Sequence, residues 1–149
     1  MLKAAHKSTM DVTTQQIDWH YETLPSKTKK ALDFLSQEPW VKERGWYLAG
    51  GTALALQVGN RRSFDLDFFT EQKDFDTKQL IARFADNKDW QTDTEDTNTV
   101  YGQLFKCKTS FIAYPFLVPK QEPSWHGFVR VLDKIDIAVM KITAISQRG

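Results

Sequence analysis

The spacing of apolar residues predicts a chain that alternates between helices and strands. Residues 26–37 carry apolar side chains at helical spacing, with lysines between them, which is typical of a surface helix. A short apolar run at 46–49 predicts a strand, and the Ala- and Leu-rich residues 52–58 predict a short helix. Residues 64–69 are apolar except for two aspartates, and they predict a second strand.

The second half of the chain continues this alternation. Asp76, with Gln79 three residues further on, is typical of the N-cap of a helix, and Asp133 precedes the last apolar segment in the same way. The expected elements are a helix at 76–86, strands at 90–94, 99–105 and 109–116, a loop at 117–129, a strand at 130–132 and a helix at 133–146. This order predicts an α+β fold with a mixed sheet flanked by helices.

The last of these helices is apolar over most of its circumference. Its apolar residues form one stripe of Ile135, Ala138, Val139, Ile142 and Ile145 and a second stripe of Ile137, Met140 and Ala144. Because the sheet can cover only one stripe, we expect something else to cover the second. That cover is either a further part of a longer protein, of which this chain is the N-terminal catalytic part, or another copy of the chain.

Composition narrows the class of protein. With 149 residues and 41% hydrophobic content, we expect one domain at 23–149 with a proper core, preceded by an N-terminal arm at 1–22. No stretch has the roughly 18 apolar residues of a membrane span, and the N-terminus has no apolar secretion signal, so we expect a cytoplasmic protein without a membrane partner. The net charge of +1 argues against a dedicated nucleic-acid coat.

Cysteine and histidine offer little metal chemistry. Cys107 is the only cysteine, which excludes an intrachain disulfide and a cysteine-built zinc site. The three histidines are scattered at His6, His20 and His126, so we expect them at surface or cap positions rather than as metal ligands. Candidate chemistry must therefore come from other residue types.

A glycine pair separates the first strand from the helix that follows it. Gly50 and Gly51 precede Thr52, so a turn without side chains leads into the N-terminus of a helix. The first N–H groups of a helix lack partners within it, and its dipole is positive at that end, so a phosphate can approach closely. The Thr52 hydroxyl offers one more donor.

The second strand carries two acids at i and i+2. Asp65 and Asp67 then point to the same face of the strand and suit Mg²⁺, which binds through one or two carboxylates and the phosphates of a substrate. Taken alone, a Gly-Gly turn is more often backbone geometry, and Asp-x-Asp is more often a solvated strand face. In combination they indicate phosphoryl-transfer chemistry.

The same segment carries a resemblance to a known family. A hydrophobic strand, Gly-Gly-Thr and then Asp-hydrophobic-Asp-hydrophobic resemble the signature of the DNA polymerase beta-like nucleotidyltransferase superfamily. The longer string Gly-Gly-Thr-Ala-Leu-Ala-Leu, Arg-Arg-Ser and Asp-Leu-Asp-Phe-Phe looks like its AbiEii toxin branch. The similarity covers about residues 25–149, is sharp over 46–70 and is weaker over 136–141. It implies a nucleotidyltransferase-like mixed sheet flanked by helices.

The resemblance also implies roles for individual residues. Those that match the nucleotide-phosphate turn are Gly50, Gly51 and Thr52, and those that match the metal-binding pair are Asp65 and Asp67.

Four further residues belong to the candidate nucleotide-binding set. Arg61 and Arg62 are either triphosphate ligands or exposed loop arginines, and Ser63 is expected in the turn beside them. Lys141 matches a lysine that the AbiEii branch is taken to use for phosphates, with an ordinary polar helix position as the alternative.

The third acid of the superfamily's metal site has no counterpart at its usual place in this chain. A third acid normally comes from a neighbouring strand, but the strand at 109–116 contains no Asp or Glu, and Ser110 lies near the place where one would be sought. Asp93 and Glu95 are conceivable substitutes.

By resemblance, the chain is expected to be a Mg²⁺-dependent nucleotidyltransferase that transfers NMP from an NTP to an RNA or protein hydroxyl. It would be the toxin of an abortive-infection toxin–antitoxin system, with a cognate antitoxin and another copy of the chain as further partners. The alternative is a catalytically weak or inactive module that binds nucleotide or mediates toxin–antitoxin contact.

Overall fold

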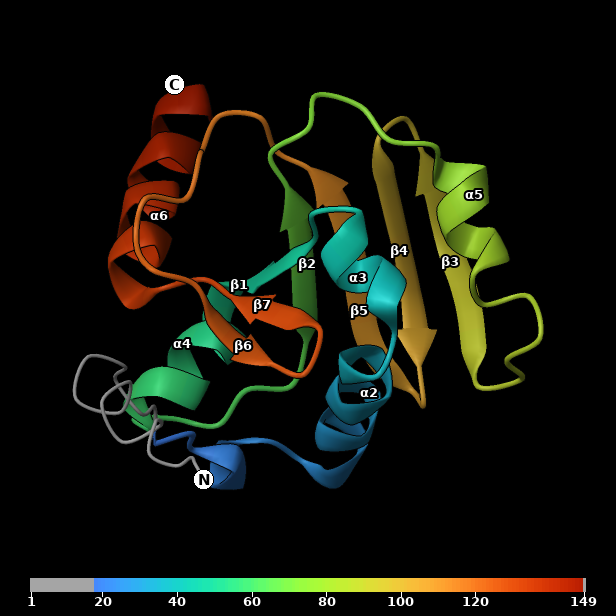
Figure 1. The fold of residues 1–149 in the computed structure, drawn as a ribbon, viewed down its shortest axis with the longest axis horizontal. Coiled ribbons are helices and arrows are strands. Elements are labelled where there is room, and N and C mark those ends of the chain that lie inside the picture. The colour runs from blue at the N-terminus through green and yellow to red at the C-terminus, as the bar shows by residue number, and fades with distance from the viewer. Residues whose placement is uncertain (1–17, 149) are drawn as a thin grey trace, which may run out of the picture.

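In the computed structural model, which describes residues 18–148, seven strands form one mixed sheet in the order β3-β4-β5-β2-β1-β7-β6 (Figure 1). The strands are β1 (Tyr47–Ala49), β2 (Leu66–Thr70), β3 (Trp90–Asp96), β4 (Thr99–Leu104), β5 (Cys107–Ala113), β6 (Ser124–His126) and β7 (Val129–Val131). The helices are η1 (Tyr21–Thr23), α2 (Ser26–Ser36), α3 (Pro39–Glu43), α4 (Gly50–Val58), α5 (Thr77–Ala82) and α6 (Lys134–Arg148). The predicted α+β class is confirmed, and none of the helices in the described part is long and apolar enough to cross a membrane.

One face of the sheet carries the core. Leu48, Phe68, Phe111 and Val100 lie opposite one another in successive strands, and all four are fully buried. Side chains at paired positions share a face, so this row forms the floor on which α2, α3 and α5 pack (Figure 1). Burying each of these large side chains stabilises the fold by roughly 1.5–3 kcal/mol.

The other face carries the polar row. Asp67 of β2 lies opposite Ser110 of β5, which lies opposite Tyr101 of β4, and Tyr101 lies opposite Thr94 of β3. Helices α4 and α6 pack against each other, and α4 contacts both β1 and β2. The half of this face that belongs to β3, β4 and β5 keeps Tyr101 exposed.

Several element boundaries differ from the prediction. Residues 39–43 form a short helix, which begins at Pro39 because proline suits the first helical position, and which buries Trp40 and Val41. Helix α4 begins at Gly50 rather than at residue 52, and β2 begins at residue 66, so that the exposed Phe64 lies outside it.

Two hairpins account for further differences. Strand β6 lies inside the segment that was expected to be a loop, and it pairs with β7 around Gly127, which has a φ of +57°. Strand β5 begins at Cys107 because Phe105 and Lys106, both at positive φ, form a two-residue turn directly after β4. The three strands predicted between residues 90 and 116 are confirmed as β3, β4 and β5, which are neighbours in the sheet.

The two predicted caps are correct, although α5 is shorter than expected. Asp76 accepts a hydrogen bond from the backbone N–H of Gln79 at 3.1 Å, and Asp133 accepts one from that of Ile135 at 2.8 Å. Helix α5 ends at Ala82 instead of residue 86, and it packs on β3 and β4.

In α6, the structure buries the second stripe, which we expected to need another cover, and exposes the first. Ile137 and Met140 of the second stripe are buried, and Ala144 is half-buried. The first stripe contains large aliphatic residues that remain 44–66% exposed, namely Ile135, Val139, Ile142 and Ile145. The prediction that the second stripe needs another cover is therefore wrong, and the first stripe is the one that stays exposed.

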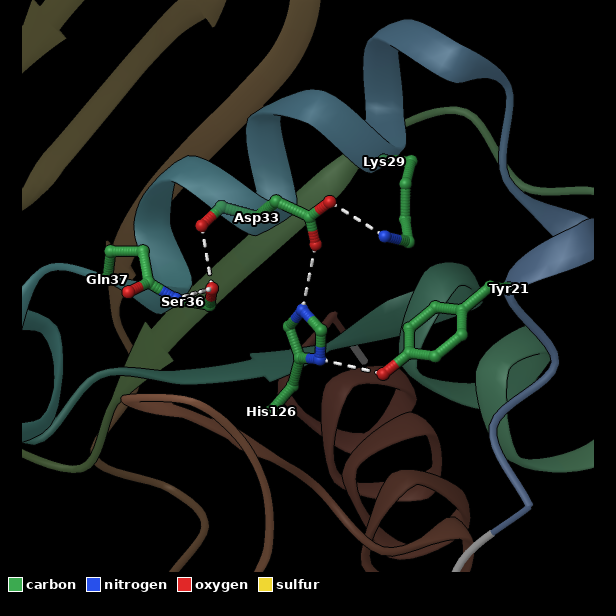
Figure 2. A network of polar contacts seen from close by, with 6 residues as sticks. All are labelled: Tyr21, Lys29, Asp33, Ser36, Gln37 and His126. Atoms are coloured by element: carbon green, nitrogen blue, oxygen red, sulfur yellow. Dashed lines mark hydrogen bonds and ion pairs between the residues drawn. The ribbon is translucent and has the colours of Figure 1, made fainter.

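His126, which was expected at a surface or cap position, is part of a hydrogen-bond network. Its Nδ1 lies 2.8 Å from the hydroxyl of Tyr21 and its Nε2 lies 3.0 Å from a carboxylate oxygen of Asp33, which also pairs with Lys29 at 2.7 Å (Figure 2). Although burial opposes it, hydrogen bonds from Lys29 and His126 hold the pKa of Asp33 below its usual value. This network ties η1, α2 and β6 together.

Residues 1–17 of the expected arm at 1–22 lie outside the described residues. Trp19 and Tyr21 pack against the core as partly buried residues. The backbone N–H of His20 donates to the carbonyl of Leu56 at 2.8 Å, which attaches this segment to α4.

Candidate active site

The site is built where β1 ends and α4 begins. Gly50 has a φ of +69°, a conformation that side chains with a Cβ rarely adopt. A Cβ at this position would also lie 2.7 Å from Oδ2 of Asp67, because Ala49 pairs with Asp67 across β1 and β2. Glycine is therefore needed at residue 50 both for the turn and for the approach of the carboxylate.

Gly51 leaves room for a guanidinium. A Cβ there would lie 2.6 Å from Nη2 of Arg61 and 3.5 Å from Oγ of Ser63. The positive charge of Arg61 thus lies at the first turn of α4, where the free N–H groups and the helix dipole already favour an anion. Of the two candidate arginines, Arg61 is the one that the fold brings to the glycine turn.

Thr52 and Ser63 are buried and hold the turn to the acid-bearing segment. The Thr52 hydroxyl donates to the backbone carbonyl of Asp65, and its oxygen lies 2.7 Å from that of Ser63. A threonine hydroxyl has one hydrogen, so Ser63 is the donor in the second bond. The single hydroxyl hydrogen of Thr52 is therefore donated to the backbone carbonyl of Asp65. We infer that Thr52 positions the site rather than binding phosphate.

The two acids form a pair without a basic partner. Asp67 is half-buried and accepts a hydrogen bond from Oγ of Ser110 at 3.0 Å, whereas Asp65 is exposed and lies just before β2 instead of inside it. Burial raises the pKa of Asp67, the negative charge of Asp65 adds to this effect, and the bond from Ser110 opposes it. No ion pair within residues 18–148 involves either carboxylate.

This arrangement fits Mg²⁺ bound together with a nucleotide. A cation would offset the cost of holding Asp67 charged in a partly desolvated place beside Asp65. In the described part of the chain, no three His, Cys, Asp or Glu side chains group closely enough to hold a metal alone. Mg²⁺ commonly uses one or two carboxylates and takes its other ligands from phosphates and water, so two acids suffice for that mode.

The structure decides between the two conceivable third acids. Glu95 lies on the opposite side of β3, where it accepts hydrogen bonds from Thr77 and Lys78 of α5. Asp93 lies on the face of Asp67, but it is three strands away, which is about 14 Å at the usual strand spacing. Neither residue can coordinate the same ion as Asp67. Neither therefore replaces the third acid, whose expected place is occupied by Ser110.

Asp93 instead lines a cavity that begins at Asp65 and Asp67. This cavity has a volume of about 320 Å³ and runs along the open face of the sheet. Its lining residues are Asp65, Asp67, Asp93, Tyr101, Gly102, Lys108, Thr109 and Ser110. The sequence did not single out Tyr101 or Lys108, because only strand register places them beside the acids.

Two candidate residues are not brought to this cluster. Arg62 is exposed, and no hydrogen bond or ion pair in the described range links it to the glycine turn or to the acids. Lys141 is exposed on α6 and likewise has no recorded bond to the site. Their roles as phosphate ligands stay predictions.

Comparisons with known proteins identify the family of this chain. A family model described as "Nucleotidyl transferase AbiEii toxin, Type IV TA system" matches residues 33–149. An uncharacterized protein of Aquifex aeolicus (strain VF5) is 39% identical over 108 residues, which cover 70% of this chain and 52% of that protein. The match therefore spans about half the length of this relative.

The chain also matches a solved structure. It is the crystal structure of an H. pylori protein described as a proposed nucleotidyltransferase, with a TM-score of 0.49 and 19% sequence identity. The match covers 79% of this chain and 59% of that one. Because the family model alone covers well over half of the residues, the chain belongs to the AbiEii family of nucleotidyl transferase toxins of type IV toxin–antitoxin systems.

Proposed function

We propose that this chain transfers a nucleoside monophosphate from an NTP to a hydroxyl group of RNA or protein. The observation that carries the proposal is the meeting of the glycine-started helix α4 with Asp67, where Gly50 lets the carboxylate lie directly against the turn. A phosphate site and a carboxylate pair within one cluster are the two parts that nucleotidyl transfer requires.

Each part of the cluster has a distinct task in this proposal. The N–H groups at the start of α4 and the guanidinium of Arg61 bind the triphosphate. Asp65 and Asp67 would hold Mg²⁺, which neutralises phosphate charge and polarises the phosphoryl oxygens when bound. Ser110 keeps the Asp67 carboxylate in place through its hydrogen bond. The acceptor hydroxyl attacks the α-phosphorus and pyrophosphate leaves.

The biological setting belongs to the same proposal. Membership of a toxin family supports a role as the toxin of an abortive-infection toxin–antitoxin pair, with a cognate antitoxin as partner. We propose that the protein acts in the cytoplasm, where NTPs and RNA are available.

A specific observation favours a second candidate function. Ser110 stands opposite Asp67, where a third acid would complete a two-metal site, and no other described residue supplies that acid to the same ion. A chain with only two acids suits a catalytically weak or inactive module that binds nucleotide or an antitoxin.

One experiment separates the two candidates. Radiolabelled NTPs are incubated with the protein, Mg²⁺ and either total RNA or a protein extract, and incorporation is compared with that in chelator. We expect Mg²⁺-dependent labelling that is lost in Asp65→Asn and Asp67→Asn. Calorimetry with NTP and Mg²⁺ provides the second measurement: tight binding without any labelling would favour the inactive module, and wild-type binding in both variants would place the site elsewhere.

A further inference from the structure

A second cavity lies on the other side of the sheet from Asp67. Its volume is about 230 Å³, and it is lined by residues of α3, of α5 and of the loop that follows β2 (Figure 1). Trp40 and Trp46 line it, and both pack against Phe111 of β5, with ring centroids 6.0 and 5.2 Å away. Phe111 directly follows Ser110, and successive residues of a strand point to opposite faces. The cavity is therefore separate from the one beside the two acids, and the two share no lining residue.

The inner wall of this second cavity is apolar. It consists of Trp40, Trp46, Phe75 and Leu80, of which all but the half-buried Phe75 are at most 5% exposed. The rings of Trp46 and Phe75 meet edge to face at a centroid distance of 4.9 Å. Because buried side chains packed in this way are held in place by their neighbours, the wall is already formed without a ligand. It can accept a flat apolar group.

Polar side chains surround the opening. They are Arg44 at the end of α3, Gln72 in the loop after β2, and Gln79 and Arg83 from α5, and all four are exposed. Within residues 18–148, neither arginine forms an ion pair, and the side-chain amides of the two glutamines form no hydrogen bond. Four side chains with free hydrogen-bonding capacity, from three separate segments, therefore line one opening.

The opening carries a net positive charge. The guanidinium of Arg83 lies over the ring of Trp40, 5.9 Å from its centroid, so the buried ring positions it. Asp76 also lines the cavity, but its carboxylate already accepts the hydrogen bond from the backbone N–H of Gln79 that caps α5. A guanidinium binds a phosphate or carboxylate group through two parallel hydrogen bonds. With two guanidiniums and one engaged carboxylate, the opening favours an anion.

We propose that this cavity is a binding site for a small aromatic anion, a flat ring that carries one phosphate or carboxylate group. The ring packs on the apolar wall, the anionic group binds Arg44 and Arg83, and the glutamine amides donate to and accept from polar atoms of the ring. The volume lies just below the roughly 300–1,000 Å³ of most small-molecule pockets, which suits one ring and one anionic group rather than a triphosphate or a polymer. The site does not depend on the proposed nucleotidyl transfer.

Nucleoside monophosphates and aromatic carboxylic acids share this chemistry, and the test distinguishes them. Calorimetry without Mg²⁺ measures the binding of AMP as the phosphate probe and of indole-3-acetate as the carboxylate probe. We expect at least one of them to bind, and the one that binds more tightly identifies the anionic group. Adenosine and inorganic phosphate should bind more weakly than AMP, because each lacks one half of the ligand. Since Trp40 and Trp46 line the cavity, bound AMP should also change the tryptophan fluorescence of the protein.

Substitutions at the opening test the role of charge. Arg44→Ala and Arg83→Ala should each weaken binding by about 10- to 150-fold, the range for a lost hydrogen bond to a charged group. Gln79→Glu changes only an exposed side chain, so the fold should be kept, and its negative charge beside the arginines should weaken binding by about fivefold or more.

Lys78→Ala is the matched control. Lys78 also carries a positive charge on α5, but it pairs with Glu95 and does not line the cavity. The affinity of this variant for the probes should stay within about twofold of wild type, since solvent and salt screen a charge outside the site.

The inference is wrong if neither probe binds, if inorganic phosphate binds as tightly as AMP, or if folded Arg44→Ala and Arg83→Ala proteins keep wild-type affinity. The Mg²⁺-dependent part of NTP binding should be unchanged in both arginine variants. Its loss would contradict a site that is separate from the candidate active site.

Discussion

Gly50→Ala should separate the folding role of the glycine turn from its role in the site. The substitution adds one methyl group at a residue with a φ of +69°. Alanine in this left-handed conformation costs about 1–2 kcal/mol, because its Cβ crowds the following carbonyl oxygen. The same methyl group would lie 2.7 Å from Oδ2 of Asp67, where ordinary contacts begin at 3.4 Å.

The second effect acts on function. The Asp67 carboxylate must move by about 0.7 Å to restore ordinary contact. Displacements of about 1 Å in a reacting site can cost about 100-fold in rate. We therefore expect Gly50→Ala to lose about 1–2 kcal/mol of unfolding free energy and at least tenfold in labelling rate.

Gly45→Ala is the matched control. Gly45 has a φ of +77°, so alanine meets a similar backbone penalty, but the nearest atom to its Cβ would be Oγ1 of Thr70 at an ordinary 3.7 Å. Urea unfolding should show similar losses in the two variants, and only Gly50→Ala should lose Mg²⁺-dependent NTP binding by calorimetry. The reasoning is refuted if the folded Gly50→Ala protein binds and labels as wild type does, or if Gly45→Ala loses binding equally.

Three further substitutions test the remaining parts of the cluster. Gly51→Val should fold, because only the flexible end of Arg61 must move, and calorimetry should show loss of NTP binding. Arg61→Ala should weaken NTP binding by about 10- to 150-fold, the range for a hydrogen bond to a charged group, while Arg62→Ala should change it little. Asp67→Asn should raise the unfolding free energy at neutral pH without metal, since a carboxylate whose folded pKa is raised costs stability when ionised. In thermal unfolding, that gain should shrink as the pH falls through the raised folded pKa, and an unchanged gain at acid pH would contradict this cause.

The cluster around the turn could be predicted because its parts are close in the sequence. β1 and β2 are antiparallel neighbours separated by one short helix, so Ala49 and Asp67 had to meet once both strands formed. The glycine pair and the paired acids are local signals, and each predicts its own geometry. Asp65 was placed less well, because the strand begins one residue after it.

The cavity beside Asp65 and Asp67 could not be predicted, because it depends on which strands become neighbours. Alternation along a strand shows that Tyr101 and Gln103 share a face, but not that this face is the one with Asp67. That relation follows from the parallel pairing of β2 with β5, which puts Asp67 opposite Ser110, and then from the register of β4. The separation of Asp93 from Glu95 likewise depends on which face of β3 the helix α5 covers.

A buried charge explains why hydrophobicity alone did not predict which stripe of α6 faces the core. Asp136 would ordinarily be placed on the solvent side of a helix, and the stripe of Ile137 and Met140 beside it would then face outward too. In the structure, Asp136 is buried and accepts hydrogen bonds from the backbone N–H groups of Lys120 and Gln121 at 3.1 and 3.0 Å.

These two bonds offset the cost of removing the carboxylate from water and supply acceptors to a loop that has no strand partner at that point. They also fix the rotation of α6, because turning Asp136 outward would leave the N–H groups of Lys120 and Gln121 without their acceptor. The stripe of Ile135, Val139, Ile142 and Ile145 is consequently left on the solvent side. The prediction that the stripe of Ile137 and Met140 needs another cover is therefore wrong, because this rotation of α6 buries both residues within the chain.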